Sequence, residues 1–473
     1  MTTVLSPPGD GSRLYPPTVV PPPAPLPLRK FLLRFVRNPL RSLPRTVYEQ
    51  PIVVHDNGRN VVAWVTAPEL VERVLLHDSQ HFPKTPLEKR VFSHTLGEGI
   101  LTSEGASWRW QRRTAAPLFR PADLAGLVPA MTAAAEEQAA RWRRSDAGAV
   151  QAVDRDMTET TFRVISATMF AGSADAEAAE ILAAADAALA TVSWDIAAAM
   201  LRLPEWVWYP GKLRRRRAAR RLRAAVAAIL ARRRAEGLAG EDLLARLALA
   251  KDPETGAPMS EKQLVDNLTT FLAAGHETTA KALTWTLYLL ARAPRWQERV
   301  LEEVDTVVGE EAVGARHLEH LPVARAVLEE TMRLYPPAPI MTRAVAEDTV
   351  LGSVTVKAGT YVVIPIFAIH RHRRLWDDPD RFDPERFSPE RRAGHARTQF
   401  MPFGFGPRTC IGGTFAMMEA TAILATLVRR ARFEWDGVHA PEPLSRITLR
   451  PEGGMPLKVW PRQAAIARAQ RSG

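Results

Sequence analysis

Cys410 is the single cysteine of the 473-residue chain, and it stands in a glycine-rich run near the C-terminus. A lone thiol cannot form an internal disulfide, a redox pair, or a structural zinc or iron–sulfur site, all of which need several sulfurs. The remaining roles are an inert buried thiol, a nucleophile and a single axial metal ligand. Glycines at 404, 406 and 412 let the backbone turn tightly, and the amides beyond Cys410 can point at its sulfur. With Arg408 two residues away, these neighbours favour the metal ligand.

An adjacent acid and alcohol, Glu277 and Thr278, lie inside a long apolar helical segment, residues 264–290. A buried carboxylate is costly, so this pair requires an explanation. In an ordinary core helix the threonine would bond to a carbonyl one turn earlier and Glu277 would face solvent. Two features argue against that interpretation. Residues 273–275 form a small-residue patch where a flat cofactor could lie, and Gly275 can relax the helical hydrogen bonds beside it.

The spacing Phe403-x-x-Gly406-x-Arg408-x-Cys410-x-Gly412 resembles the haem-ligand signature of the cytochrome P-450 superfamily. The resemblance implies that Cys410 is the proximal ligand of the haem iron and that Phe403 packs beside the thiolate. It also implies that Arg408 binds a haem propionate. A thiolate ligand pushes electron density onto the iron and favours cleavage of the O–O bond.

The stretch Ala274-Gly275-His276-Glu277-Thr278 resembles the oxygen-activating segment of the long central helix in the same superfamily. This resemblance implies that Thr278 hydrogen-bonds the iron-bound dioxygen, that Glu277 relays protons from solvent, and that Ala274 contacts the haem. His276 is expected to be a neighbour and not a second iron ligand. With both acid and alcohol present, monooxygenation with dioxygen is expected over peroxide use or isomerisation.

Glu330 and Arg333 stand at i and i+3 of a predicted helix, which alone indicates only a weak surface pair. With Arg386 downstream, they resemble the Glu-x-x-Arg helix of the superfamily and its later arginine. The resemblance implies a buried, mutually neutralising network that holds the loop of Cys410, so its expected role is structural.

Trp108 and Arg112 resemble the Trp-x-x-x-Arg segment of an early helix in the superfamily, and Arg343 lies where many relatives place a further arginine. A guanidinium suits bidentate carboxylate binding, so these residues are expected at the porphyrin edge. Substrate contacts are expected from the segment 85–99 and from three small or apolar residues. These three residues are Ala273, Ala338 and Met341.

The resemblance covers roughly residues 50–460 and implies a monooxygenase that inserts one atom of O₂ into a hydrophobic fatty acyl, terpenoid or polycyclic substrate by hydroxylation or epoxidation. The implied cofactor is haem b, with O₂ as co-substrate. Electrons would come ultimately from NAD(P)H through a separate ferredoxin and ferredoxin reductase. Two alternatives stay open: a haem-thiolate isomerase or dehydratase, which needs no electron donor, and a non-catalytic haem sensor, which needs neither Glu277 nor Thr278.

The chain is basic, with a net charge of +11 and a pI near 10.1, yet its arginines are dispersed through helical stretches without a DNA- or RNA-binding signature. We therefore expect no nucleic acid partner, and an acidic electron donor steered to a basic face near Cys410. The basic run 212–223 favours a solvated helix face. No signal peptide or transmembrane anchor is expected, which predicts a soluble, cytoplasmic monomer. Residues 28–36 fit a membrane-surface contact or, better, a short helix on the body.

The elements that must position these groups are mostly helical, and the predicted fold class is mainly α with small β-sheets, as in the cytochrome P-450 fold. A proline-rich lead is expected over residues 1–30 and a single haem-binding domain over residues 31–473. Helices are predicted within 68–291 and over 320–335 and 411–432. Strands are predicted at 52–55 and 61–66 around an Asp-Asn-Gly turn, and at 354–356 and 361–366. Two closing strands are predicted within 446–460 around Gly453-Gly454.

Overall fold

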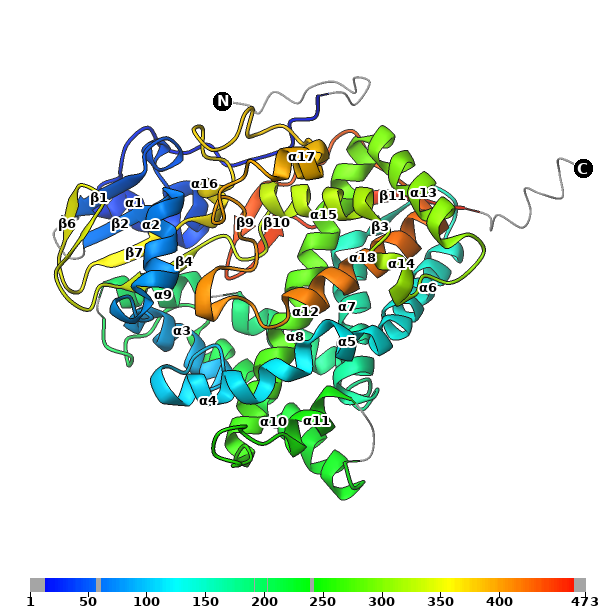
Figure 1. Cartoon of the computed structure of the whole chain (residues 1–473), viewed down its shortest axis with the longest axis horizontal. Helices are drawn as coiled ribbons and strands as arrows, with labels where there is room; N and C mark the ends of the chain where they lie inside the picture. Colours follow the sequence, from blue (N-terminus) through cyan, green and yellow to red (C-terminus); the bar gives the residue numbers. More distant parts are fainter. Residues whose placement is uncertain (1–12, 57–60, 191, 202, 239–241, 463–473) are drawn as a thin grey trace, which may run out of the picture.

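Helix α12 (Glu261–Arg292) is the longest helix of the described residues and runs through the middle of the molecule (Figure 1). It begins at a capping box, in which the side chains of Ser260 and Gln263 each accept a hydrogen bond from the other residue's backbone N–H. Helices α7, α10, α15 and α18 pack around it, and most of its residues are buried. A helix that is apolar on nearly all sides is typical of a protein core.

The computed structural model describes residues 13–56, 61–190, 192–201, 203–238 and 242–462. The helices besides α12 are α1 (Leu28–Arg37), α2 (Pro68–Glu72), α3 (Pro86–Leu96), α4 (Gly105–Ala115), α5 (Pro121–Leu124), α6 (Val128–Arg143), α7 (Val153–Phe170), α8 (Ala178–Leu189), α9 (Val192–Met200), α10 (Lys212–Ala235), α11 (Leu243–Leu249), α13 (Pro294–Val308), α14 (Ala315–Leu318), α15 (Pro322–Leu334), α16 (Ile366–Ile369), α17 (Pro389–Arg392) and α18 (Gly413–Arg430). The strands are β1 (Ile52–Asp56), β2 (Val61–Val65), β3 (Ala149–Ala152), β4 (Met341–Ala344), β5 (Thr349–Leu351), β6 (Val354–Val356), β7 (Tyr361–Ile364), β8 (Ala431–Glu434), β9 (Pro443–Ser445), β10 (Leu449–Pro451) and β11 (Pro456–Pro461).

The strands form small sheets, of which the one with β1, β2 and β7 lies at the left of Figure 1, the one with β3 and β11 at the right, and the pair β9 and β10 near the middle. The largest has the order β1-β2-β7-β4, in which β2 and β7 are parallel and the other pairs are antiparallel. A three-stranded sheet has the order β3-β11-β8, and two further pairs are β5 with β6 and β9 with β10. Strand β4 brings Met341 and Arg343 to the central helices, while β9 and β10 bring the C-terminal segment there.

The structure confirms the mainly helical class with small sheets, and most predicted elements are present. Strands β1 and β2 pair as the predicted hairpin, while the expected turn at residues 57–60 lies outside the described residues. The two strands predicted around Gly453-Gly454 are present as β10 and β11, although they do not pair with each other: β10 pairs with β9, and β11 pairs with β3 and β8. Strand β3 lies in a stretch predicted to be helical. Its partner β11 is distant in sequence, so no local pattern indicates the pairing.

The segment before α1 packs against the body of the molecule. Leu14 and Val19 are buried in the main hydrophobic core, and the Tyr335 hydroxyl donates a hydrogen bond to the Pro17 carbonyl at 2.7 Å. The expected boundary after residue 30 falls inside α1. Within the described chain, residues 178–200 are long and apolar enough to cross a membrane, but 56% of the most apolar window is buried, as in a core helix.

Candidate active site

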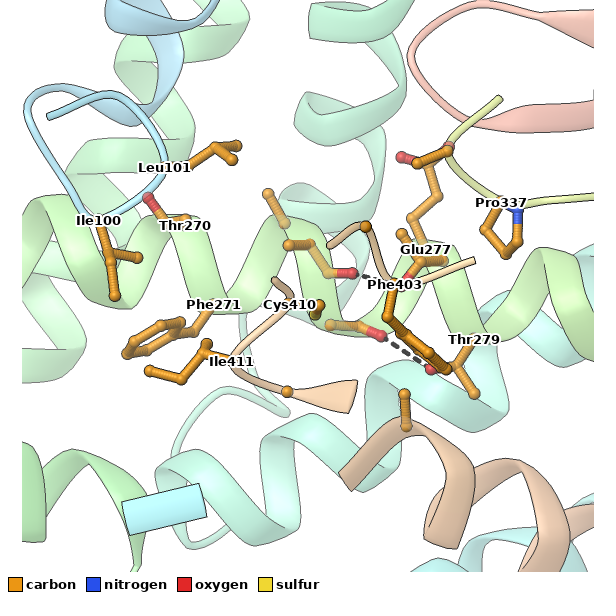
Figure 2. Close-up of a pocket in the computed structure, with 18 of the residues that line it drawn as sticks. Ile100, Leu101, Thr270, Phe271, Glu277, Thr279, Pro337, Phe403, Cys410 and Ile411 are labelled. Carbon is orange, nitrogen blue, oxygen red and sulfur yellow. Dashed lines mark hydrogen bonds between the residues drawn. The ribbon is translucent and has the colours of Figure 1, made fainter. Parts of the chain in front are cut away.

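A cavity of about 510 Å³ lies between α12 and the loop that precedes α18. Figure 2 shows residues of both walls, with Phe403, Cys410 and Ile411 from the loop and Phe271 and Glu277 from α12. Part of the predicted substrate segment 85–99 lines this cavity. So does each residue that the sequence individually predicts to contact the cofactor, dioxygen or substrate: Trp108, Arg112, Ala273, Ala274, Glu277, Thr278, Ala338, Met341, Arg343, Phe403, Arg408 and Cys410. Motifs that are far apart in sequence therefore meet in one place.

The loop of Cys410 depends on two glycines. Gly404 and Gly406 have φ angles of +73° and +75°, a region that favours glycine. A Cβ atom on Gly406 would also lie 2.1 Å from the carbonyl oxygen of Leu75, so no other residue fits there. Gly412, expected to serve the same turn, has an ordinary φ of −90°. No atom lies within 4 Å of a Cβ placed on it, so this glycine instead leaves space in the cavity beside Cys410.

The Cys410 side chain is directed at the cavity and is exposed there. Its backbone N–H donates to the Phe403 carbonyl at 2.8 Å, which closes the loop. Burial raises the pKa of the thiol, whereas the backbone N–H of Gly412 and the guanidinium of Arg112 lower it. These two groups are of the kind that stabilise a thiolate. A single sulfur donor that faces open space fits one axial ligand of a metal cofactor.

The edge of the cavity is strongly cationic. Arg112, Arg343 and Arg408 line it, and within the described part of the chain none of them pairs with a carboxylate; each donates to a backbone carbonyl at 2.7 to 3.1 Å. Burial lowers the pKa of each guanidinium. The Arg408 guanidinium also stacks 4.3 Å from the Trp108 ring centre. Three such groups facing a cavity fit an anionic cofactor edge, as the propionates of haem would provide.

The small residues of α12 divide between two faces. Ala274 is exposed to the cavity, where it leaves room for a flat group. Gly275 serves helix packing, because a Cβ there would lie 2.8 Å from Ile165 of α7. Helix α12 is continuous through this stretch, and the relaxation of its hydrogen bonds at Gly275 stays a prediction.

Thr278 and His276 lie on different faces of α12. The Thr278 side chain lines the cavity and donates to the Ala274 carbonyl at 2.8 Å. His276 is buried away from the cavity, with its ring edge-on to Phe162 of α7 and its Nδ1 2.6 Å from the Leu272 carbonyl. Burial lowers the pKa of this imidazole. Its position agrees with the expectation that it is not an iron ligand.

Glu277 is held by a polar cluster from the C-terminal part of the chain. The Thr448 hydroxyl donates to its Oε1 at 2.6 Å, and Nε of Arg450 donates to the same oxygen at 2.9 Å. Arg450 also pairs with Asp186 at 3.2 Å, and the Asp186 side chain is 69% exposed. Burial raises the pKa of Glu277, but Arg450, Thr448 and Lys281 outweigh it, so the pKa lies below its usual value. The carboxylate reaches solvent through Arg450 and Asp186, which the sequence did not predict.

Glu419 of α18 is a second buried acid, and the sequence motifs assign it no role. Its side chain is fully buried, and within the described residues neither of its carboxyl oxygens has a hydrogen-bond partner. Burial raises its pKa well above the usual value, which favours the protonated carboxyl group. An acid within an otherwise apolar helix is the sequence signal that could have identified it.

The predicted structural network is present and fully buried. Arg333 makes a double ion pair with Glu330, at 2.6 and 2.8 Å, and Arg386 lies 3.6 Å from the same carboxylate. Arg333 also donates to the backbone carbonyl of His370 at 2.7 Å. Nε2 of His370 in turn accepts the N–H of Met401 at 3.0 Å, at the start of the Cys410 loop. Burial lowers the pKa of His370 to about 3, so the imidazole stays neutral and can accept this bond.

The remaining walls of the cavity are mostly apolar. Helix α3 contributes Val91, Phe92 and Leu96, within the segment predicted to contact substrate. Arg215 of α10 also lines the cavity and is buried, so the expectation of a solvated face for residues 212–223 is wrong at this position. Its guanidinium donates to backbone carbonyls and pairs with Asp195, which offsets its burial.

Residues 20–457 match the family model for cytochrome P-450. The chain is 32% identical to an 11-oxo-beta-amyrin 30-oxidase of Glycyrrhiza uralensis over 437 residues, which cover 85% of this chain and 81% of that protein. It is 31% identical to a cyclooctat-9-en-7-ol 5-monooxygenase of Streptomyces melanosporofaciens over 416 residues, which cover 87% and 88% of the two proteins. Its structure resembles the crystal structure of a cytochrome P-450 heme domain with a TM-score of 0.80 and 26% identity, covering 94% and 99% of the two chains.

The relatives include plant and bacterial proteins, and those named here are an oxidase and a monooxygenase. The site fits the same chemistry, because a lone cysteine, a cationic rim and an acid–alcohol pair face one cavity. The chain therefore belongs to the cytochrome P-450 family and is a haem-dependent monooxygenase.

Proposed function

We propose that the protein inserts one atom of O₂ into an apolar, ring-containing terpenoid, by hydroxylation or epoxidation. The observation that carries this proposal is the cavity itself, a mostly apolar space that Cys410, Glu277 and Thr278 all line. The relatives act on 11-oxo-beta-amyrin and cyclooctat-9-en-7-ol by name, and the apolar walls from α3 suit a substrate of this kind. Fatty acyl and other polycyclic compounds are the competing substrate classes.

Haem b would be held by Cys410 at the iron and by Arg112, Arg343 and Arg408 at the propionates, with Trp108, Phe403 and Ala274 in contact with the ring. When bound, the haem supplies the activation of O₂. The chain contributes the environment: Gly412 and Arg112 favour the thiolate of Cys410, and the apolar walls exclude water from the reacting atoms.

Thr278 and Glu277 would deliver protons on the other side of the cavity. The Thr278 hydroxyl stands at the wall and can exchange its bond to the Ala274 carbonyl for one to a ligand. The described hydrogen bonds of Glu277 all go to Oε1, so Oε2 is the oxygen free to carry a proton. Arg450 bridges Glu277 to the exposed Asp186, and its movement would open Glu277 to protons from solvent.

Electrons would come from NAD(P)H through a ferredoxin and a ferredoxin reductase. An acidic donor suits the side of the molecule near Cys410, where Arg109 of α4 is exposed and Arg397 lies 5.2 Å from the Phe405 ring centre. We propose a soluble, cytoplasmic monomer that meets this donor transiently. Charge reversal at Arg109 and Arg397 should raise the KM for the donor with little change in kcat at saturation.

The test begins with a screen of terpenes, fatty acids and aromatic compounds for a substrate-induced spin shift of the haem. A terpene that gives the shift should then be converted only with O₂ and an electron donor. Conversion of an oxygenated substrate without any donor would instead support an isomerase or dehydratase. Loss of the red-shifted Soret band of the reduced carbonyl complex in Cys410→Ala is expected, and its persistence would refute the assigned ligand.

Thr278→Ala should lower the product formed per O₂ consumed by roughly tenfold or more, because proton delivery is disturbed. Thr284→Ala is the matched control, since Thr284 makes the same bond to a carbonyl of α12, to Ala280 at 2.7 Å, but is buried outside the cavity. Normal coupling in Thr278→Ala would contradict the proton-delivery role.

A further inference from the structure

A lysine lies buried in the middle of helix α12. Lys281 is 7% exposed, and its neighbours along the chain, Ala280 and Ala282, are buried as well. Its ammonium group donates to the Thr158 hydroxyl of α7 at 3.1 Å, and within the described chain it forms no ion pair and no other hydrogen bond. An ammonium group has three N–H donors, so burying it with one partner is costly. Lys281 does not line the cavity, and the proton delivery described above does not use it.

Lys281 is placed within reach of both Glu277 and a group that solvent reaches. It follows Glu277 by one turn of helix, and a lysine four residues after a glutamate is at the spacing that allows an ion pair. Its side chain is directed to Thr158, which is half-buried at the surface of α7. The four-carbon side chain of lysine is flexible. Its rotation can therefore carry the ammonium group from Thr158 to Glu277.

The charges around Lys281 favour the release of its proton. Burial lowers the pKa of Lys281, and Arg450 of β10 lowers it further. Glu277, Asp154 of α7 and Asp186 of α8 raise it, but the pKa stays below its usual value. A lysine of this kind has access to the neutral amine, so it can lose and regain a proton. Arg450 also pairs with Glu277, but a guanidinium stays protonated in proteins and cannot pass a proton on.

We propose that Lys281 is a further positioning residue of the reaction, which returns a proton to Glu277 after Glu277 has given one to the cavity. The ammonium group gives a proton to Oε2 of Glu277, which leaves a neutral amine and a protonated carboxyl group. The amine then takes a proton from solvent at the Thr158 hydroxyl, and the ammonium group is restored. His276 is a poor carrier, since burial lowers the pKa of its imidazole. This role of Lys281 rests on the proposed function, in which Glu277 and Thr278 deliver protons.

The product formed per O₂ consumed tests this role in the haem-loaded chain, with a substrate found in the screen described above. Lys281→Met should lower it roughly threefold or more, because Glu277 regains protons more slowly. Lys281→Arg should be impaired to the same degree, since a guanidinium keeps the charge but does not release a proton. Lys262→Met is the matched control, because Lys262 is the other lysine of α12 and its side chain is 63% exposed. It should couple O₂ to product as the unaltered chain does.

The pH dependence separates proton transfer from a purely structural role. In the unaltered chain the product per O₂ should fall as the pH rises through the lowered pKa of Lys281, and this fall should be absent in Lys281→Met. The free energy of unfolding gives a readout without turnover. A lysine whose folded pKa is lowered contributes stability above its unfolded pKa and loses it as the pH falls through the folded pKa. The urea midpoint of the unaltered chain should therefore rise, relative to that of Lys281→Met, as the pH is raised above neutral.

The variants distinguish the possible outcomes. Full coupling in Lys281→Arg would overturn the proposal in favour of a role for the charge alone, and full coupling in Lys281→Met would overturn it outright. Urea midpoints that stay parallel at every pH would also overturn it, because Lys281 would then not be a buried group that loses its proton. Lys281→Gln, which can still donate to Thr158, replaces either variant if it fails to hold haem. Normal coupling in Thr278→Ala refutes the proposed function itself, whereas loss of coupling there with normal coupling in Lys281→Met refutes the role of Lys281 alone.

Discussion

Replacing Arg450 with glutamine should destabilise the protein by leaving the Glu277 carboxylate buried without its main charge partner. The side chains of Glu277 and Arg450 are 7% and 23% exposed, so the pair is mostly shielded from water. Breaking such a pair from one side costs about 3–5 kcal/mol. We expect the lower end, about 3 kcal/mol, because Thr448 still donates to Glu277 and the ammonium group of Lys281 remains near it.

A double-mutant cycle separates the stranded charge from other effects of the substitution. Urea midpoints would be measured on equally haem-loaded Arg450→Gln, Glu277→Gln and the double variant. The double variant should recover at least about 1 kcal/mol relative to Arg450→Gln, because it has no buried charge to strand. Arg432→Gln is the control, since Arg432 pairs with Glu434 at the surface and its loss should cost less than about 0.5 kcal/mol.

The pH dependence of the free energy of unfolding tests the same explanation independently. In the unaltered chain the pKa of Glu277 is lowered, so its pair contributes stability above the unfolded pKa and loses it as the pH falls through the folded pKa. In Arg450→Gln, burial becomes the main influence and raises the folded pKa. The stability from this group is then complete below the unfolded pKa and is lost as the pH rises. The deficit of Arg450→Gln should therefore shrink on acidification. A deficit that grows at low pH, or equal stability of the single and double variants at every pH, would refute this reasoning.

Three further substitutions test the scaffold. Gly406→Ala should lower the free energy of unfolding by about 3 kcal/mol or more and lower the haem content, because the added Cβ meets the Leu75 carbonyl. Gly437→Ala is the control and should cost only about 1 kcal/mol, because Gly437 has a φ of +82° but open space around it. Equal decreases of the urea midpoint in the two variants would contradict the steric account. Arg333→Lys should lower the free energy of unfolding by about 3 kcal/mol and weaken haem retention, because lysine cannot reproduce the double ion pair and the carbonyl contacts. Full haem occupancy in this variant would argue against the network's role. Gly275→Ala should lower the free energy of unfolding by about 1–3 kcal/mol, because the added Cβ clashes with Ile165. Adding Ile165→Val to the same chain should restore part of this stability, which thermal midpoints would measure. If the second substitution restores nothing, the clash with Ile165 is not the cause of the loss.

The cysteine loop and the charged motifs were predictable because their chemistry is local in sequence. Spacing alone placed Cys410, Arg408 and Phe403 together, and the pair of Glu330 and Arg333 lies within one turn of helix. The order of the strands in the sheets was harder to predict from the sequence. The pairing of β11 with β3 joins segments about 300 residues apart, as in Pro456 with Ala152, and nothing near either strand specifies the other.

The sequence also did not predict the hydrogen-bond and ion-pair partners of Glu277. Glu277 meets Thr448 and Arg450 only because the chain returns past α12 near its C-terminus. Whether the basic run 212–223 faces water depends on its neighbours, and Arg215 turns inward where α3 and α8 cover it. Composition fixes how many charges a helix carries, but only packing decides which of them become buried.

The close approach of Gly275 to Ile165 restricts how the binding specificity of this protein can diversify. A larger residue at that position presses against Ile165 of α7, which lines the cavity together with Gly275, so the change would force the two helices apart. Ala274 has the opposite limit, since any bulk there intrudes where the porphyrin is expected. Variation that alters substrate choice must therefore come from the far walls, on α3 and around Ala338, where side chains can change size without moving the central helix. Because the tightly packed wall of α12 is separate from these walls, the substrate pocket can change shape while the groups that carry the reaction stay in place.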